Sequence, residues 1–426
     1  MFKTFILHKI QNYTKRYFKK HPEVKLIVVA GSVGKTSTKR ALATVLSQRY
    51  RVRMHEGNHN TEFAVPLAIL GIDYPDDVHS PLAWLAVFRA AAARIRQPSD
   101  VDVIIQELGT DNPGDIAAFG EYLAPDLALV TAVTPEHMEF FKTLEAVAKE
   151  ELSVSDFSKK VLINRDDIDS RFAEFETNDN FNTYGTTGAA EYRFELNEFT
   201  PTAGYRGTIY ALDAEPFEAT IDVVGEHSLR PVVGAIATGL QMGLTSADIV
   251  SGLAKITAVP GRMSSLKGMN DVIVIDDTYN SSPAAAAAAL QTLYSFDFAS
   301  QRIAVLGDMR ELGETSKAEH EHLGQLCDPS LLSWVVLVGP ETMNYTAPAA
   351  RAKGCQVHLA RNAIEAGEFV RSVVQPGTAV LVKGSQNTIY LEETVKLLVE
   401  LSEHEKLVRQ SPYWLAEKKK YFDTFQ

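Results

Sequence analysis

The residues best suited to chemistry lie in one stretch, Gly31-Ser32-Val33-Gly34-Lys35-Thr36-Ser37. Glycines at the first and fourth positions let backbone N–H groups turn towards a phosphate, and Lys35 adds a positive charge. The Thr36 hydroxyl is the kind of group that holds magnesium beside a nucleotide. We therefore predict a cradle for a nucleoside triphosphate. Because Val29 stands where the longer G-x-x-x-x-G-K pattern has its first glycine, a tight turn without a ligand is the alternative.

This stretch is placed between two predicted elements. The apolar run 26–30 is typical of a buried parallel strand, and residues 36–46 have the pattern of the helix that follows it. Strands are also predicted over 101–108 and 126–133, and each is followed by a polar side chain. Glu107 ends the first of these strands, and His137 comes just after the second.

The carboxyl ends of parallel strands meet at one edge of a sheet, and ligands bind there in open α/β folds. Glu107 and His137 are thus candidates to face the cradle. The alternatives are a strand-end acid paired with a lysine for Glu107 and an ordinary surface or core histidine for His137.

The chain alternates strands and helices, which predicts an α/β fold with a doubly wound, mostly parallel sheet and a phosphate-binding loop. Residues 192–224 have short alternating runs and predict a small antiparallel annex. The strand–helix rhythm restarts after 260–262, which predicts a second, Rossmann-like α/β domain. The boundaries predicted are an N-terminal helix over 1–22, an ATP-binding domain over 23–259, a C-terminal domain over 260–410 and a tail over 411–426.

Composition narrows the function classes. The chain has 426 residues, 45% hydrophobic content and 23% charged content, as in a globular enzyme. Its two cysteines, Cys327 and Cys355, have no metal-ligand spacing and predict a reducing compartment without disulfides. The net charge of −12 argues against a nucleic-acid binder. No apolar run is long enough to span a membrane.

The first 22 residues differ from the rest. They contain six lysines or arginines and no acid, and their aromatic and aliphatic residues recur at helical spacing. This pattern predicts a basic amphipathic helix, either packed on the first domain or touching an anionic membrane surface.

The order and spacing of the motifs resemble the Mur ligases, most closely those that add D-alanyl-D-alanine to the UDP-muramoyl tripeptide of peptidoglycan. The resemblance covers residues 24 to about 400. The motifs that carry it are Gly31-Ser32-Val33-Gly34-Lys35-Thr36, Gly57-Asn58-His59-Asn60, Glu107-Leu108-Gly109, Pro113-Gly114-Asp115-Ile116, Pro135-Glu136-His137-Met138-Glu139, Gly225-Glu226-His227, Pro260-Gly261-Arg262, Asp276-Asp277-Thr278-Tyr279-Asn280, Leu306-Gly307-Asp308-Met309 and Lys383-Gly384-Ser385.

The resemblance implies an ATP- and Mg²⁺-dependent ligase that transfers the γ-phosphate to a carboxylate and lets an amine displace it from the acyl phosphate. It implies that Lys35 neutralises phosphate charge, that Thr36 and Glu107 hold one magnesium, and that His137 binds a second. For the nucleotide it implies Arg262, Asp277, Tyr279 and Asn280, and for the substrates Asn58, Asn60, Lys383 and Ser385. The alternatives are a hinge salt bridge for Arg262 and a strand-end turn for Lys383 and Ser385.

Several positions depart from the family pattern. Where the family generally has a carbamylated lysine that binds the second magnesium, this chain has Glu151. We predict that Glu151 supplies the carboxylate directly, the alternative being a solvated helix acid. Ser228, Pro231, Ser282 and Gln386 replace residues near the adenine and the amine. The family's usual N-terminal uridine-binding domain is also expected to be absent, which leaves the acceptor less defined.

Three functions remain open. The first is a Mur-type ligase of cell-wall precursor synthesis, the second is the same chemistry on a folate-like or lipid-linked carboxylate, and the third is a nucleotide-binding subunit without ligation. We expect a monomer that acts on small-molecule or precursor carboxylates and amines in the cytoplasm, with no nucleic acid and with residues 1–22 placed for peripheral contact at the inner face of the membrane.

Overall fold

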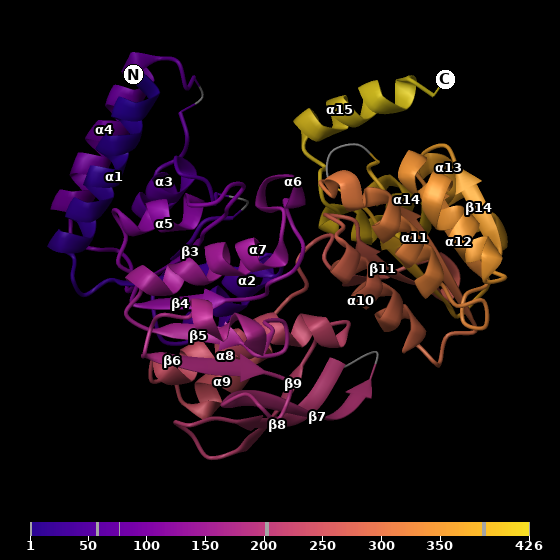
Figure 1. The fold of residues 1–426 in the computed structure, drawn as a ribbon, viewed down its shortest axis with the longest axis horizontal. Helices are drawn as coiled ribbons and strands as arrows, with labels where there is room; N and C mark the ends of the chain where they lie inside the picture. Colours follow the sequence, from indigo (N-terminus) through magenta and orange to yellow (C-terminus); the bar gives the residue numbers. More distant parts are fainter. Residues whose placement is uncertain (1, 57–58, 76, 201–203, 386–388, 426) are drawn as a thin grey trace. The chain divides into compact units, whose positions relative to one another are not determined.

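The structure is a computed structural model that describes residues 2–56, 59–75, 77–200, 204–385 and 389–425 (Figure 1). The chain forms two compact units. The first contains Met1–Asp222 and Leu229–Ile256, and the second contains Val223–Ser228 and Thr257–Gln426.

A large sheet forms the centre of the first unit. Within the described residues its nine strands lie in the order β2-β3-β1-β4-β5-β6-β7-β8-β9. Neighbours from β2 to β7 pair in parallel, and β7, β8 and β9 pair antiparallel, so the predicted annex continues the same sheet. The bounds are β1 Lys25–Ala30, β2 Val52–Met54, β3 Val103–Glu107, β4 Leu127–Val130, β5 Val161–Asn164, β6 Phe181–Gly185, β7 Tyr192–Thr200, β8 Gly204–Tyr210 and β9 Phe217–Ile221.

Helices cover both faces of this sheet. Val28 of β1 and Ala128 of β4 point into a core shared with α3, α5 and α7. Leu129 points to the opposite face, where it meets Gly234 of α8. The bounds are α1 Phe2–Lys20, α2 Lys35–Leu46, α3 Ala64–Leu70, α4 Pro81–Arg96, α5 Asp115–Gly120, α6 Met138–Phe141, α7 Leu144–Leu152, α8 Leu229–Gln241 and α9 Ser246–Leu253. Because both faces are covered, the parallel strands are continuous apolar runs, as the sequence of β1 shows.

The second unit has its own sheet and two apolar cores. Its described strands lie in the order β10-β11-β15-β12-β13-β14, with only β10 antiparallel to its neighbour. Ile275 and Leu381 belong to the core on one face, and Val274 and Val380 belong to the core on the other. The bounds are β10 Ser264–Lys267, β11 Ile273–Asp277, α10 Pro283–Tyr294, β12 Gln301–Gly307, α11 Ser316–Leu326, β13 Trp334–Val338, α12 Ala347–Ala352, β14 Val357–Ala360, α13 Ala363–Val373, β15 Thr378–Lys383, α14 Glu392–Leu398 and α15 Pro412–Asp423.

The end of the chain differs from the prediction of a tail over 411–426. Helix α15 starts after Ser411, whose side chain caps the Trp414 N–H. Lys418 is buried, and its Nζ lies 3.0 Å from Glu392 Oε1 and 2.7 Å from Glu393 Oε1. Within the segment predicted as a surface tail, the structure thus has a helix with one buried lysine, and the other described side chains are exposed or partly exposed.

Candidate active site

The Gly31–Ser37 loop lies at the topological switch point of the sheet, where the strand order reverses. Strand β1 pairs with β3 on one side and β4 on the other, so the loop after β1 lies at the point where ligands bind in such folds. Helix α2 begins directly after the loop, with Gly34 at its N-cap in a left-handed conformation (φ 90°) and no side-chain cap. The first-turn N–H groups of α2 therefore face the position of an anion.

Glycine is required at position 31 because of its backbone conformation and because its neighbours leave no room for a Cβ atom. Its φ is +121°, and a Cβ there would lie 2.2 Å from Thr131 Oγ1 and 2.8 Å from the Ala132 nitrogen. Thr131 Oγ1 also donates to the Val33 carbonyl at 2.6 Å. Ser32 Oγ accepts from the Thr134 N–H at 3.1 Å. The loop is thus held against the segment that follows β4, and only glycine fits at its first position.

Glu107 lies beside the start of α2, as its place at a strand end predicts. Its Oε2 accepts from Thr36 Oγ1 at 3.2 Å, and its Oε1 lies 2.7 Å from Lys39 Nζ. Both charged side chains are almost fully buried. The lysine pair that the sequence left open therefore exists together with the predicted Thr36 contact. Lys39 was missed, although it lies one helical turn after Lys35.

Glu151 reaches the loop from helix α7. It is fully buried, and its Oε2 accepts from the Gly31 N–H at 2.6 Å. Its Oε1 has no hydrogen-bond partner among the described residues. This carboxylate is therefore not the solvated helix acid that the sequence left open.

Glu136 is a further acid at this place that the sequence analysis did not select. Burial holds the pKa of its carboxyl well above the usual range, the positive charge of Lys35 opposes that shift, and the neighbouring Glu151 reinforces it. Glu136 Oε1 also lacks a hydrogen-bond partner among the described residues. Its position after β4 was visible in the sequence, but its burial beside Glu151 was not.

The adjacent Glu150 has a structural task. Its carboxylate accepts from Thr110 Oγ1 at 3.1 Å and from the Gly114 and Ile116 N–H groups at 2.7 Å each. Glutamine offers one acceptor oxygen in place of two. We expect Glu150→Gln to lower the free energy of unfolding by about 1–3 kcal/mol, measured by urea denaturation. Glu145→Gln, at an exposed position of α7, is the matched control, and equal stability of the two variants would contradict this assignment.

His137 is in an unusual backbone conformation. Its φ is 46°, in the left-handed region that non-glycine residues rarely adopt. Its Nε2 lies 3.7 Å from Asp111 Oδ1. The described residues contain no group of three or more His, Cys, Asp or Glu side chains arranged to hold a metal. The metal role of His137 therefore stays a prediction.

The segment around residue 60 is next to β3. The Gly109 N–H donates to the Asn60 carbonyl at 3.0 Å, and a Cβ on Gly109 would lie 2.5 Å from Asn60 Nδ2. His59 stacks on His55 with ring centroids 3.5 Å apart, and burial lowers the pKa of His59. The predicted substrate residue Asn58 lies outside the described residues.

In the second unit, predicted residues gather at the ends of β11 and β15. Asp277 and Lys383 are register partners, and Lys383 Nζ lies 2.9 Å from Asp277 Oδ2. Lys383 also donates to the Asn280 carbonyl, and Asp277 Oδ1 accepts from the Met263 N–H at 3.2 Å. A buried ion pair thus organises this end of the sheet.

Three further residues complete this group. The Arg262 guanidinium lies 4.5 Å from the centre of the Tyr279 ring, which is a cation–π contact. Ser385 is almost fully buried, and its hydroxyl has no hydrogen-bond partner among the described residues.

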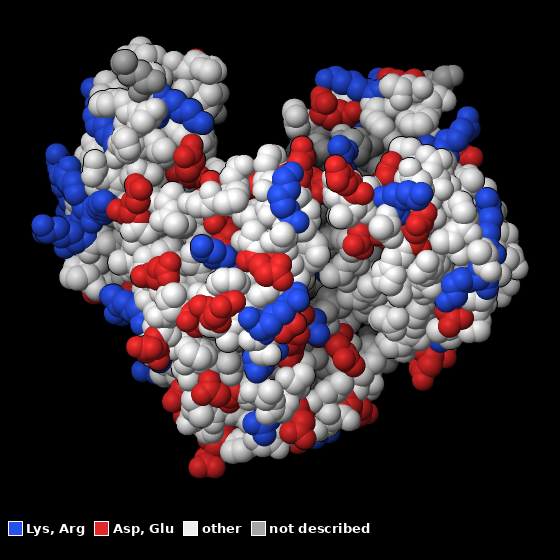
Figure 2. Space-filling model, in the orientation of Figure 1, with Lys and Arg blue, Asp and Glu red and all other residues white. Residues whose placement is uncertain are grey.

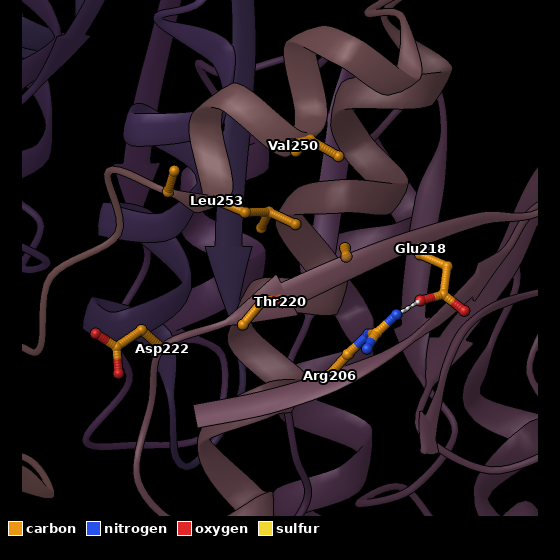
Figure 3. Close-up of a pocket in the computed structure, with 8 residues that line it drawn as sticks. Arg206, Glu218, Thr220, Asp222, Val250 and Leu253 are labelled. Atoms are coloured by element: carbon orange, nitrogen blue, oxygen red, sulfur yellow. Dashed lines mark hydrogen bonds and ion pairs between the residues drawn. The ribbon is translucent and has the colours of Figure 1, made fainter. Parts of the chain in front are cut away.

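A separate hollow of about 420 Å³ lies between β8, β9 and α9 (Figure 3). Val250 and Leu253 line it, and the ion pair of Arg206 with Glu218, 2.9 Å long, lies on its rim. None of the predicted site residues lines this hollow, so it adds nothing to the candidate site.

Two family models match this chain. The Mur ligase middle domain matches residues 29–239, and the Mur ligase glutamate ligase domain matches residues 261–386. Together they cover most of the chain and include the loop, Glu107, Glu151 and the Asp277–Lys383 pair.

Individual relatives agree with these matches. The chain is 26% identical to a UDP-N-acetylmuramoyl-tripeptide–D-alanyl-D-alanine ligase of Bacillus subtilis over 92% of this chain and 80% of that protein. It is 27% identical to the enzyme of the same name from Escherichia coli, over 88% of this chain and 77% of that protein. The structure also resembles the MurF ligase of Thermotoga maritima, solved in complex with ADP, with a TM-score of 0.73 and 25% identity. The match covers 91% of this chain and 83% of that chain.

Proposed function

Because the chain belongs to the Mur ligase family, it is an ATP-dependent ligase that forms amide bonds, and we propose that it adds D-alanyl-D-alanine or a similar amine to a carboxylate of a peptidoglycan precursor. The carboxylate attacks the γ-phosphorus of ATP, and ADP leaves. The amine then attacks the carbonyl carbon of the acyl phosphate, and inorganic phosphate leaves with its electron pair. The amide nitrogen loses its proton to the surroundings.

One observation carries the proposal, namely the Gly31–Ser37 loop with Glu107 and Glu151 against it. The N–H groups at the start of α2 and the Lys35 side chain supply positive potential for the β- and γ-phosphates. Phosphoryl transfer depends mainly on such positioning and charge neutralisation. This geometry explains why the loop residues, and not the hollow near β8, are the proposed ATP site.

The same residues fit Mg²⁺, which prefers one or two carboxylates together with phosphate oxygens. Thr36 and Glu107 already contact one another, and Glu151 is a fully buried carboxylate that lies against the Gly31 N–H and beside Glu136. We propose Thr36 and Glu107 for one ion and Glu151 with His137 for a second. When bound, Mg²⁺ supplies charge neutralisation to the phosphate oxygens.

In the second unit, we propose that Arg262, Asp277, Tyr279 and Asn280 serve the nucleotide, and that Lys383 and Ser385 serve the amine. The buried ion pair of Asp277 with Lys383 supports a preformed site at the ends of β11 and β15. Asn60 is proposed to serve the carboxylate substrate from the first unit.

Among the described residues, no helix has the length and apolarity needed to cross a bilayer. We propose that the ligase works in the cytoplasm as a monomer and that residues 1–22 place it at the inner face of the membrane.

The proposal is tested with the purified full chain, ATP, Mg²⁺, UDP-muramoyl tripeptide and D-alanyl-D-alanine. We expect phosphate release that requires both substrates. Phosphate release without either substrate would indicate an ATPase. Release with a folate or a lipid-linked precursor, and not with the tripeptide, would show that the carboxylate substrate is a different one. Nucleotide binding without release on any acceptor would indicate a non-catalytic subunit.

A further inference from the structure

Helices α1 and α4 form a parallel pair at the surface of the first unit (Figure 1). Near their carboxyl ends, His21 Nε2 lies 3.3 Å from the Ile95 carbonyl oxygen. Nearer the middle, Lys9 Nζ lies 4.6 Å from the centre of the Phe88 ring. Since these contacts keep the same order along both helices, the two amino ends lie at the same end of the pair.

The amino ends of α1 and α4 pack against α3 and the segment before it. Ile6 and Ile10 of α1 share an apolar cluster with Trp84 and Phe88 of α4. Phe63 lies between the helices, because Lys3 Nζ is 5.1 Å from its ring and the Trp84 ring is 6.5 Å away. The inward face of each helix is therefore fully used in packing, and the outward residues are available to a partner.

The outward residues at the amino ends are large and apolar. Phe2 is 48% exposed, Phe5 57%, Leu82 78% and Leu85 41%. We name these four residues the apolar tip. Single exposed apolar residues are ordinary, but a group on two adjacent helix ends marks an interaction site.

The outward residues towards the carboxyl ends are basic. Neither helix contains an acid, whereas α1 has six lysines or arginines and α4 has three arginines. Apart from Lys3 at the amino end, the exposed members are Lys15, Arg16, Lys19, Lys20, Arg89 and Arg96, and we name these six the basic flank. Figure 2 shows lysine and arginine side chains gathered along the outer side of this helix pair. Two lysine or arginine residues of these helices outside the flank are paired with acids: Lys3 lies 3.6 Å from Glu62, and Arg94 lies 2.9 Å from Asp100.

We propose that the apolar tip and basic flank of α1 and α4 together form a docking surface for an anionic lipid membrane. The tip enters between the lipid chains, and the flank lies against the headgroup phosphates. This surface extends the proposed contact of residues 1–22 to α4, and it is independent of the ligase reaction.

Charge and apolarity together select this occupant. In a chain of net charge −12, a surface without acids on two helices is complementary to anionic phosphates. A nucleic acid would leave the four apolar side chains in water. A second copy of the chain, docked through the same surface, would bring the six positive charges of the basic flank against six others.

The test measures co-sedimentation of the full chain with vesicles of phosphatidylglycerol and phosphatidylcholine or of phosphatidylcholine alone. We expect binding to the anionic vesicles only. The variant Lys15→Gln, Arg16→Gln, Lys19→Gln and Lys20→Gln should bind at least about 10²-fold more weakly, since each charge contributes roughly fivefold. Phe5→Ser with Leu82→Ser should also lose binding.

The matched controls replace exposed residues of the second unit: Lys317, Arg351, Lys353 and Arg371 by glutamine for the flank, and Phe298 with Leu401, which are 48% and 83% exposed, by serine for the tip. The controls should bind as the unmodified chain does, and all variants should keep its ligase turnover on soluble substrates. Equal binding to neutral vesicles, or unchanged binding by the tip variant, would overturn the proposal. So would a dimer that dissociates in the tip variant, or RNA binding that the flank variant loses while vesicle binding persists.

Discussion

Replacing Lys35 by methionine is expected to lower ATP turnover by at least about 10³-fold while the fold is kept. Lys35 is the first residue of α2 and contacts the Gly31 carbonyl, and it is only half-buried, so the core does not depend on its charge. Its ammonium group is the positive charge that we propose for the β- and γ-phosphates, and methionine retains its approximate length without that charge. The measurement is ADP formation at saturating substrates, with nucleotide affinity from calorimetry.

The control for this variant is Lys25→Met at the start of β1. Lys25 lies at the other end of the same strand, and its Nζ is 3.4 Å from Asp126 Oδ1. We expect its turnover to equal that of the unmodified chain. If Lys35→Met kept normal turnover with an intact circular dichroism spectrum, the Gly31–Ser37 loop would not be the ATP site.

Replacing Glu151 by glutamine is expected to lower turnover by about 10²-fold or more, because it removes a negative charge at the loop while it preserves the shape of the side chain. The amide oxygen of glutamine can still accept the Gly31 N–H that Glu151 Oε2 now accepts. The other oxygen, Oε1, is replaced by an NH₂ group that cannot bind a cation.

The measurement is the Mg²⁺ concentration required for half-maximal nucleotide binding, together with turnover. We expect Glu151→Gln to require a higher Mg²⁺ concentration than the unmodified chain. The neighbouring Glu150→Gln should require the same Mg²⁺ concentration as the unmodified chain, because its defect lies in stability. Unchanged Mg²⁺ dependence and full activity of Glu151→Gln would show that its carboxylate serves only to hold the Gly31 N–H.

The local parts of the site follow from the sequence. The Gly31–Ser37 loop lies between a buried strand and a helix, and both elements are formed by their own residue patterns, so the place of the loop in the fold was predictable, while its role as the ATP site stays a prediction. The restart of strands and helices beyond residue 260 and the cap of α10 by Ser282 were predictable for the same reason. Such features depend on neighbours along the chain.

The tertiary structure decided the pairings across the chain. Glu151 meets Gly31 over 120 positions, Glu107 meets Lys39, and Asp277 meets Lys383. A carboxylate at a strand end looks the same in a sequence whether it meets a lysine, a backbone N–H or water. Only the packing of α2 and α7 on the sheet decides which of these it meets.

The sequence by itself determined the family, the place of the Gly31–Ser37 loop between a strand and a helix, and the basic nature of residues 1–22. It could not show that α4 lies parallel to α1, that Glu136 is buried beside Glu151, or that Lys418 is anchored in a helix at the carboxyl end. Those facts depend on which surfaces exclude water together, and that exclusion is a property of the folded chain as a whole.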